Sequence, residues 1–540
     1  MTVATSATGD AGGYEGKTFL GHPRGLYVLF FAEMWERFSF YGMRAILIFY
    51  LLQHWLFAEE RAYGIYGAYA ALVYISPIVG GYLADRYIGQ RKAVQLGAIL
   101  LTIGHGLMAL EGNGGQDDPT INVFWLALSF IIMGVGFLKA SISVMVGQLY
   151  AQGDPRRDPA FTIFYMGINL GAAAGSLIAG YLGMTYGWAY GFGAAGVGML
   201  LGLIVFTIGR PALMGRGEAP DPAQLRRPVM GIPLEFMVYL GAVAGVGIVW
   251  FLIQYQAIVG WLLGGAGAVV LAYFLYEATV KLDKVSSHRI YAAIFLIALQ
   301  PLFWALFEQA GSSLNVYTDR SVDREILGWE VPAAMFQSIN AIYIVMLGPV
   351  FAYLWLWLAR HKMEPSTPAK FGIGLVQLGL GFFVLVWGAQ ANPGLTPVIF
   401  IFLIYLLHTT GELCLSPVGL SAMTKLAPSR LMGLLMGAWF LSSAAGNFIG
   451  GLIAQATGGE DIAGEEAAAE RVLDVYSTIG WVAVGVGIGV MLVAPFVKRL
   501  MHPEAYDGGP EQDRALAGYS EIGEPAAPGM FPGEETKPRR

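Results

Sequence analysis

Long apolar stretches separated by short polar loops run through most of the chain. Many of these stretches reach the roughly 20 residues that an α-helix needs to cross a bilayer. Counting them predicts fourteen membrane-spanning helices. We expect these helices near residues 25–52, 63–84, 93–111, 122–149, 160–186, 190–209, 234–254, 257–279, 290–316, 332–359, 371–390, 396–422, 431–457 and 475–499.

The loops between these stretches alternate in charge. Every second loop is basic, as in the segment that holds Arg86, Arg91 and Lys92, whereas the others are short or acidic. Because basic loops stay on the cytoplasmic side, the pattern predicts a multi-pass protein of the cytoplasmic (inner) membrane with both termini in the cytoplasm.

The spacing of the stretches divides the chain into six helices, then two, then six. Segment 210–233 is polar, basic and rich in proline, as expected of a cytoplasmic linker. The two helices after it lack charge within the membrane until Glu277, so we expect them to face lipid outside any transport pathway. The predicted organisation is a disordered N-terminus (1–20), a six-helix bundle (21–209), a linker with two extra helices (210–289), a second six-helix bundle (290–500) and a disordered cytoplasmic tail (501–540).

Composition supports a membrane protein and argues against several other classes. Hydrophobic residues make up 56% of the chain and charged residues only 13%, about half the usual share of a soluble domain. The net charge of −6 gives no indication of nucleic-acid binding. The one cysteine excludes a thiolate metal site, and no phosphate-binding GxxxxGK[ST] loop is present. We therefore expect no cofactor, no metal and transport work driven by a gradient.

The first apolar stretch contains four charged residues, Glu33, Glu36, Arg37 and Arg44. Their steps of three, four and seven place them on one helical face. A charge at the bilayer centre costs at least about 2.5–3.5 kcal/mol, so such residues normally face a protein interior or a watery cavity. Four in one helix predict a functional site.

The loop after the second stretch reads GYLADRYIGQRK and resembles the loop signature of the major facilitator superfamily. This superfamily has an all-α fold of six-helix bundles that rock around a central site, so the resemblance implies that fold. With the count of apolar stretches above, the expected protein is an all-α membrane protein of this fold with fourteen helices, 6 + 2 + 6. Asp85, Arg86 and Arg91 would then form a gate at the cytoplasmic rim. The alternative is a solvated turn whose charges only set topology.

Further motifs are similar to the proton-dependent oligopeptide transporter family. The first helix holds Glu33-xx-Glu36-Arg37-Phe38 with Tyr41-Gly42, and the fifth holds Phe164-Tyr165-xx-Ile168-Asn169. The other matches are Gly134-x-Gly136-xx-Lys139, Phe303-Trp304-xxx-Glu308-Gln309, Phe336-Gln337-Ser338-x-Asn340, Glu412-xxx-Ser416-Pro417 and Trp439-Phe440. The resemblance implies a symporter that imports di- and tripeptides with protons and functions as a monomer in the lipid bilayer.

A short peptide is a zwitterion, and the two halves of the chain offer opposite charges for its ends. Arg37, Arg44 and Lys139 suit a carboxylate, which arginine binds with two parallel bonds, while Glu308 and Glu412 suit an ammonium group. By family resemblance, the peptide-binding residues are Arg37, Tyr41 and Lys139 for the C-terminus, Asn169, Asn340 and Glu412 for the N-terminus, the neighbouring Ser416, and Tyr74, Trp304, Trp439 and Phe440 for side chains. Each of these four aromatic residues has packing as its alternative role.

Proton coupling requires a carboxyl group whose pKa changes between conformations. We expect it in Glu33 and Glu36, which share Arg37, with Lys139 as a second partner across a close contact of the first and fourth helices at Gly134 and Gly136. The family resemblance adds two gating pairs, Arg44 with Glu308 on the periplasmic side and Lys139 with Glu412 on the cytoplasmic side. Glu308 is therefore also a proton-coupling candidate.

Two other functions remain open from the sequence. One is a proton-coupled transporter of nitrate or another small solute, against which the intact ExxER motif argues. The other is a peptide sensor that does not transport, which would be expected to carry a soluble output domain. No HExxH or GxSxG motif suggests an enzyme. Phe40, where the family usually has tyrosine, is expected to alter substrate preference.

Overall fold

A computed structural model describes residues 18–151, 154–392, 394–458 and 464–503. Most of the two segments expected to be disordered, 1–20 and 501–540, lies outside these ranges. The inner edge of the first segment is ordered, since Thr18–Phe19 forms β1 and pairs with β2 (His22–Pro23).

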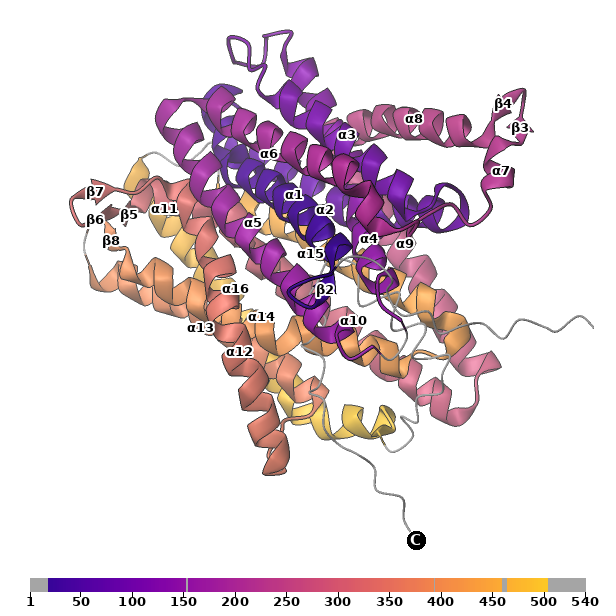
Figure 1. Ribbon diagram of the computed structural model, residues 1–540. Coiled ribbons are helices and arrows are strands. Elements are labelled where there is room, and N and C mark those ends of the chain that lie inside the picture. Colours follow the sequence, from indigo (N-terminus) through magenta and orange to yellow (C-terminus); the bar gives the residue numbers. More distant parts are fainter. Residues whose placement is uncertain (1–17, 152–153, 393, 459–463, 504–540) are drawn as a thin grey trace, which may run out of the picture.

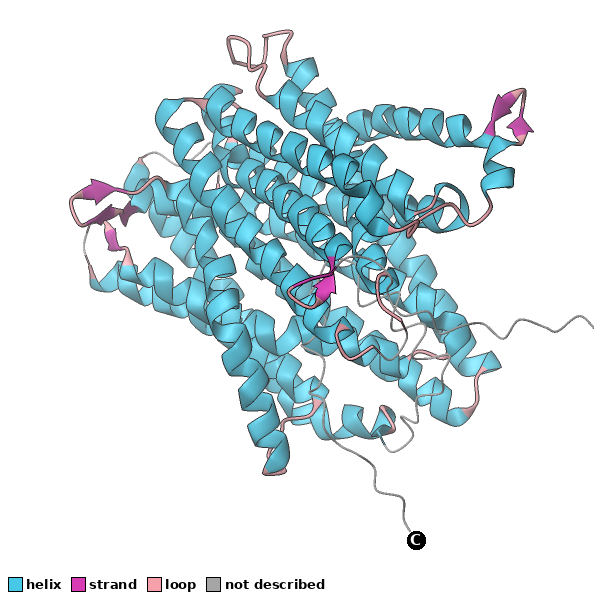
Figure 2. Cartoon of the chain, viewed as in Figure 1, coloured by secondary structure: helices cyan, strands magenta, loops and turns pink. Residues whose placement is uncertain are grey.

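Helices account for nearly all of the described chain, as Figure 2 shows. Twelve of them, within the described ranges, are long and apolar enough to cross a membrane. Two more, α1 and α3, have 26 and 19 residues, which also suffices for a crossing. This is consistent with the predicted count of fourteen. The α-helices are α1 (Arg24–Phe49), α2 (Glu59–Leu83), α3 (Gln90–Met108), α4 (Ile121–Gln148), α5 (Arg157–Tyr186), α6 (Trp188–Gly209), α7 (Pro222–Arg226), α8 (Leu234–Gln254), α9 (Gln256–Tyr276), α10 (Lys284–Phe307), α11 (Ser313–Ser321), α12 (Ser338–Arg360), α13 (Thr367–Ala391), α14 (Ile399–Leu426), α15 (Met432–Thr457) and α16 (Glu465–Leu500).

Short helical segments and two-residue strands complete the described chain. Three π-helical turns extend α1, α2 and α9, and 3-10 turns precede α11, α12 and α15. The turns are η1 (Tyr50–His54), η2 (Ala84–Ile88), η3 (Arg210–Leu213), η4 (Glu277–Lys281), η5 (Glu308–Gly311), η6 (Ala333–Gln337) and η7 (Ser429–Leu431). The remaining strands are β3 (Pro228–Val229) with β4 (Ile232–Pro233), β5 (Val322–Asp323) with β8 (Thr396–Pro397), and β6 (Glu325–Ile326) with β7 (Trp329–Glu330).

Two predicted helices differ from the observed ones for identifiable reasons. The stretch expected as one helix over 290–316 is divided, because η5 interrupts it at Glu308 and α11 follows after Ser312. The stretch expected to begin at 475 begins at Glu465. Its first turns are polar, so an apolar-length criterion does not detect them.

The helices form two bundles (Figure 1). In the first, α1 packs mainly against α5 and α6, and α3 against α4; in the second, α13 packs against α14 and α16, and α10 against α15. The bundles meet chiefly where α2 contacts α15 and α5 contacts α12. We call the end where α1 ends and α2 begins the outer end. The opposite end, where α2 ends and α3 begins, is the inner end.

The extra helices lie outside both bundles. α8 contacts α4, whereas α9 contacts α15 and α2. Their outward faces are apolar, with Phe236 57% and Trp261 82% exposed. This exposure agrees with the expectation that the pair faces lipid.

Glycine allows the main inter-bundle contact to be close. A Cβ atom on Gly451 of α15 would lie 2.8 Å from the Cα atom of Gly67 in α2 and 2.9 Å from the carbonyl oxygen of Tyr63. Small residues at such crossings let helix backbones approach each other within a membrane.

Replacement of Gly451 by valine is therefore expected to separate α2 from α15. Overpacking of this kind costs about 1–3 kcal/mol, so the melting temperature of the purified protein should fall by several degrees. Gly437→Val is the matched control, since a Cβ atom at Gly437 in the same helix meets nothing within 4 Å. Equal melting temperatures for the two variants would contradict the close contact.

Candidate substrate-binding and gating site

A buried cluster of three charges lies on α1. Because side chains four residues apart lie on one helical face, Glu33 is directly beside Arg37. The Arg37 Nε atom lies 2.8 Å from Glu33 Oε1 and 2.6 Å from Glu36 Oε2. Glu33, Glu36 and Arg37 are 1%, 0% and 4% exposed. The sequence prediction that the two carboxylates share one guanidinium matches this geometry.

Several polar atoms of this cluster have no hydrogen-bond partner among the described residues. They include Arg37 Nη2, Glu33 Oε2 and Glu36 Oε1. Burying an unsatisfied charged group is costly. With both carboxylates ionised, the three side chains carry one net negative charge, so uptake of one proton makes them neutral. The cluster can thus bind a proton first and then, once neutral, offer Arg37 to an anion.

Lys139 comes to this region from α4. Its ammonium nitrogen lies 4.4 Å from the centroid of the Tyr74 ring on α2, a distance suited to a cation–π contact. The expected role of two glycines near it needs correction. Gly134 packs against Gly97 and Leu101 of α3, and Gly136 against Ser76 of α2. These glycines bring α4 close to α3 and α2, rather than to α1.

The second bundle contributes a carboxylate held by an amide. Asn340 Nδ2 on α12 donates to Glu412 Oε2 on α14 at 2.9 Å and to Thr409 Oγ1 at 3.0 Å. Thr409 in turn donates to the carbonyl oxygen of Tyr405. These contacts orient Glu412 from within its own bundle. Asn340 therefore positions Glu412 in addition to its expected part in peptide binding.

An ion pair joins the bundles near the outer end. Arg44 Nη2 on α1 bonds to Glu308 Oε2 in η5, and Arg44 Nε donates to Tyr66 Oη at 2.8 Å. This is the pair expected from the family resemblance. The side chains of Arg44 and Glu308 are 12% and 5% exposed. Their gating role stays a prediction.

Three further contacts across the bundles were missed by sequence reasoning. Asn315 Nδ2 and Gln337 Nε2 both donate to the carbonyl oxygen of Ala45, at 3.0 and 3.3 Å, and Arg320 pairs with Glu59. No sequence signal connects residues more than 250 positions apart, although Gln337 lies in one of the family motifs. These bonds join the two bundles at the outer end alongside the pair of Arg44 and Glu308.

The aromatic candidates are mostly packed side chains. Trp439 is fully buried beside Phe371 and Gly419, and Trp304 donates to Gln300 within α10. Tyr41 has the Arg44 guanidinium 5.8 Å from its ring centroid. Asn169, Phe440 and Ser416 are buried on α5, α15 and α14.

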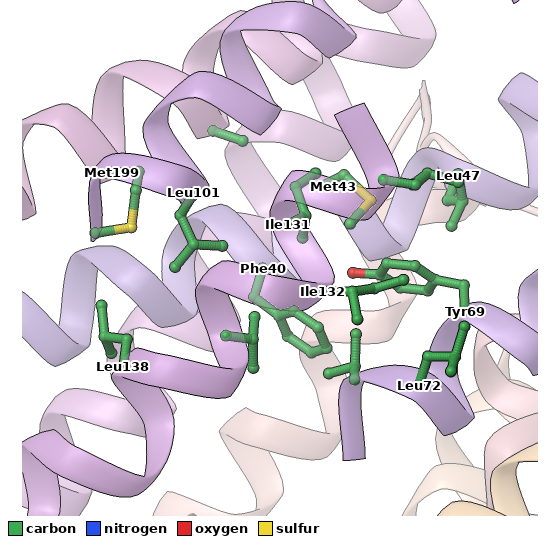
Figure 3. Packing of buried hydrophobic residues seen from close by; sticks show 14 of the residues in the cluster. Phe40, Met43, Leu47, Tyr69, Leu72, Leu101, Ile131, Ile132, Leu138 and Met199 are labelled. Carbon is green, nitrogen blue, oxygen red and sulfur yellow. The ribbon is translucent and has the colours of Figure 1, made fainter. Parts of the chain in front are cut away.

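Phe40 lies within the hydrophobic core of the first bundle. It is 6% exposed, and Figure 3 shows it among the buried side chains that include Ile132 and Leu138. The Arg37 guanidinium lies 5.9 Å from its ring centroid. An effect of Phe40 on substrate preference would therefore act through the placement of Arg37.

Two of the three rim residues, Asp85 and Arg91, have partners on their own side of the molecule. Exposed Asp85 accepts a hydrogen bond from Gln90 at 2.8 Å, and Arg91 pairs with Glu218 of the linker at 2.5 Å. Arg86 is exposed. The gating role expected for the three residues stays a prediction.

Comparison with known proteins gives a consistent result along the chain. The family model described as "POT family" matches residues 91–469. The uncharacterized transporter YclF of Bacillus subtilis is 39% identical over 497 residues, which cover 90% of this chain and 96% of that protein. The peptide transporter YePEPT of Yersinia enterocolitica is 39% identical over 460 residues, which cover 81% of this chain and 88% of that protein.

Solved structures show the same relationship. A crystal structure of a mutant of peptide transporter POT in complex with alafosfalin has a TM-score of 0.78 and 37% identity, covering 90% of this chain and 97% of that one. A POT family transporter in complex with 5-aminolevulinic acid has a TM-score of 0.75 and 32% identity, with coverage of 89% and 98%.

The buried cluster on α1 makes a prediction about stability. Arg37→Ala should destabilise the protein strongly, because removing one partner of a buried ion pair costs about 3–5 kcal/mol. Adding Glu33→Gln and Glu36→Gln to Arg37→Ala should recover part of the loss, since no buried carboxylate is then left without a cation. Melting temperatures in detergent test this. A triple variant no more stable than Arg37→Ala would contradict the electrostatic explanation.

Proposed function

Because the chain belongs to the POT family, we propose that it is a proton-coupled symporter that imports di- and tripeptides across the cytoplasmic membrane. It is a secondary transporter of the major facilitator type and not an enzyme. The proposal requires a site for both ends of a zwitterion, a group that binds a proton, and a means of alternating access.

The single observation that carries the proposal is the division of charge between the bundles. The first bundle offers Arg37, whose buried Nη2 lacks a hydrogen-bond partner among the described residues, together with Lys139. The second offers Glu412, held by Asn340. A peptide carboxylate suits the former and a peptide ammonium the latter. A ligand held at both ends would contact both bundles at once.

The α1 cluster supports coupling to protons. While Glu33 and Glu36 are both ionised, they compete with a peptide carboxylate for the guanidinium of Arg37. Protonation of the carboxylate pair removes this competition and releases Lys139 or Arg37 for the peptide, so protons and a peptide bind better together than separately. Deprotonation on the cytoplasmic side would restore the internal pairing and expel the peptide.

Alternating access would come from rocking of bundle 21–209 against bundle 290–500. Arg44 with Glu308 would close the periplasmic side, and Lys139 with Glu412 the cytoplasmic side, where Asp85, Arg86 and Arg91 form the rim. We place both termini in the cytoplasm, so that the outer end defined above is periplasmic. The protein would function as a monomer with the proton as coupling ion and without a cofactor.

The first test is uptake of labelled dialanine into proteoliposomes with an inward proton gradient. We expect accumulation above equilibrium that an uncoupler abolishes, and none in liposomes without protein. Binding without accumulation would favour a peptide sensor. No interaction with dialanine would favour nitrate or another small solute.

The role of the carboxylate pair gives a second test. Glu33→Gln or Glu36→Gln should abolish gradient-driven uptake but preserve peptide counterflow, because exchange requires no net proton movement. Glu60→Gln, at an exposed carboxylate of α2, is the control and should leave both activities intact. Uphill uptake that survives in both single variants would exclude this coupling scheme.

The outer ion pair gives a third test. Arg44→Glu and Glu308→Arg should each reduce uptake at least tenfold, since each places two like charges at the bundle interface. The double variant should recover part of the activity, because an ion pair can form with exchanged partners. Lack of any recovery would argue against a pairing role for these residues in gating.

A further inference from the structure

The two extra helices are attached to different bundles at the same end of the molecule. Each carries one carboxylate at the inner end, Glu235 at the start of α8 and Glu277 directly after α9, and each carboxylate pairs with a cation of a different bundle. We propose that the α8–α9 hairpin is a strap across the inner end that limits how far the two bundles separate there.

The start of α8, which we call the first foot of the strap, is fixed to the first bundle. Glu235 Oε1 accepts from Lys92 Nζ of α3 at 2.6 Å and from Tyr239 Oη at 2.8 Å. The linker before it is also held, since Arg91 N donates to the carbonyl oxygen of Gly217 at 2.8 Å and the Arg91 side chain pairs with Glu218. The start of α8 therefore moves with the first bundle.

The segment directly after α9, which holds Glu277 and is the second foot of the strap, is fixed to the second bundle. Arg430 Nη2, in the turn between α14 and α15, lies 2.6 Å from Glu277 Oε2, and the Glu277 side chain is only 8% exposed. The Ser287 hydroxyl of α10 donates to the carbonyl oxygen of Ala278 at 2.7 Å. The covalent connection to α10 would leave the angle of α9 free, whereas these contacts fix it.

The two legs between the feet contact each other little. α8 packs on α4, while α9 packs on α15 and α2, and Figure 1 shows the two helices diverging. They join at the outer end through Tyr255, whose φ and ψ of −117° and 67° interrupt the helix. When the inner end opens, the inner ends of α8 and α9 must move apart about this turn. The ion pairs of Glu235 and Glu277, which fix each helix to its bundle, resist that movement.

The strap rests on the rocking motion proposed above, but not on peptide as the substrate. Its test can therefore be made on the protein alone. The only cysteine, Cys414, is buried, so a Cys414→Ser background permits site-directed spin labelling. Arg24→Cys and Lys425→Cys place labels at exposed inner-end positions, one in each bundle. Leu110→Cys and Leu395→Cys, at residues 60% and 56% exposed, do the same at the outer end.

Distances between spin labels, measured by pulsed electron–electron double resonance, should change when the ion pair of Glu235 or of Glu277 is removed. Glu277→Gln and Glu235→Gln are each expected to lengthen and broaden the inner-end distances by several ångströms while leaving the outer-end distances unchanged. Glu364→Gln is the matched control. It removes an ion pair with Lys370 at the same end but within one bundle, so it should change neither distribution. Exchange of partners in Glu277→Arg with Arg430→Glu should restore the narrow inner-end distribution.

Glu308→Gln separates failure of the strap from failure of the rocking motion, because breaking the outer pair should shift both distributions if the bundles rock. If it does so while Glu277→Gln and Glu235→Gln change nothing, the strap is excluded and the rocking stands. If none of the three changes either distribution, both proposals are overturned.

Discussion

One guanidinium between two carboxylates, buried inside a helix bundle, is the constraint on which the rest of the site depends. The three side chains of α1 cannot all be charged and all be satisfied by one another. With both carboxylates ionised, the cluster lacks one positive charge, which a single proton can supply. Only after that proton is bound can Arg37 pair with an anion without leaving excess negative charge in the cluster. The buried imbalance thus links proton binding to anion binding through one side chain.

The second bundle complements this arrangement with neutral groups. Asn340 holds Glu412 through a neutral amide, so this contact brings no positive charge to the carboxylate. At the outer end the strong charged contact of Arg44 with Glu308 is accompanied by neutral bonds from Asn315 and Gln337. Protonation can weaken an ion pair, but it leaves an amide–carbonyl bond intact. The contacts between the bundles at this end are therefore of two kinds, one that protonation of Glu308 would weaken and one that it would leave unchanged.

The sequence was most informative where function depends on short spacing or on apolar length. Glu33 and Arg37 are four residues apart on a helix, so their contact follows from helical geometry alone. Helix positions follow from apolar length, except where a polar turn such as η5 divides a span. The direction in which Gly134 and Gly136 pack could not be derived, since a glycine gives no indication of its neighbour. Contacts such as Asn315 with Ala45 depend on the docking of the two bundles, which local pattern does not encode.

The acceptor of the hydrogen bonds from Asn315 and Gln337 is the main-chain carbonyl oxygen of Ala45. Every amino acid supplies a carbonyl oxygen at that position, so the acceptor persists whatever side chain residue 45 carries. Only the two donors can be removed by substitution. A score of position 45 by its side chain alone would miss this role, although two amides from the other bundle converge on its carbonyl oxygen. The acceptor is thus independent of side-chain chemistry at residue 45, whereas each bond is lost directly when residue 315 or 337 loses its amide.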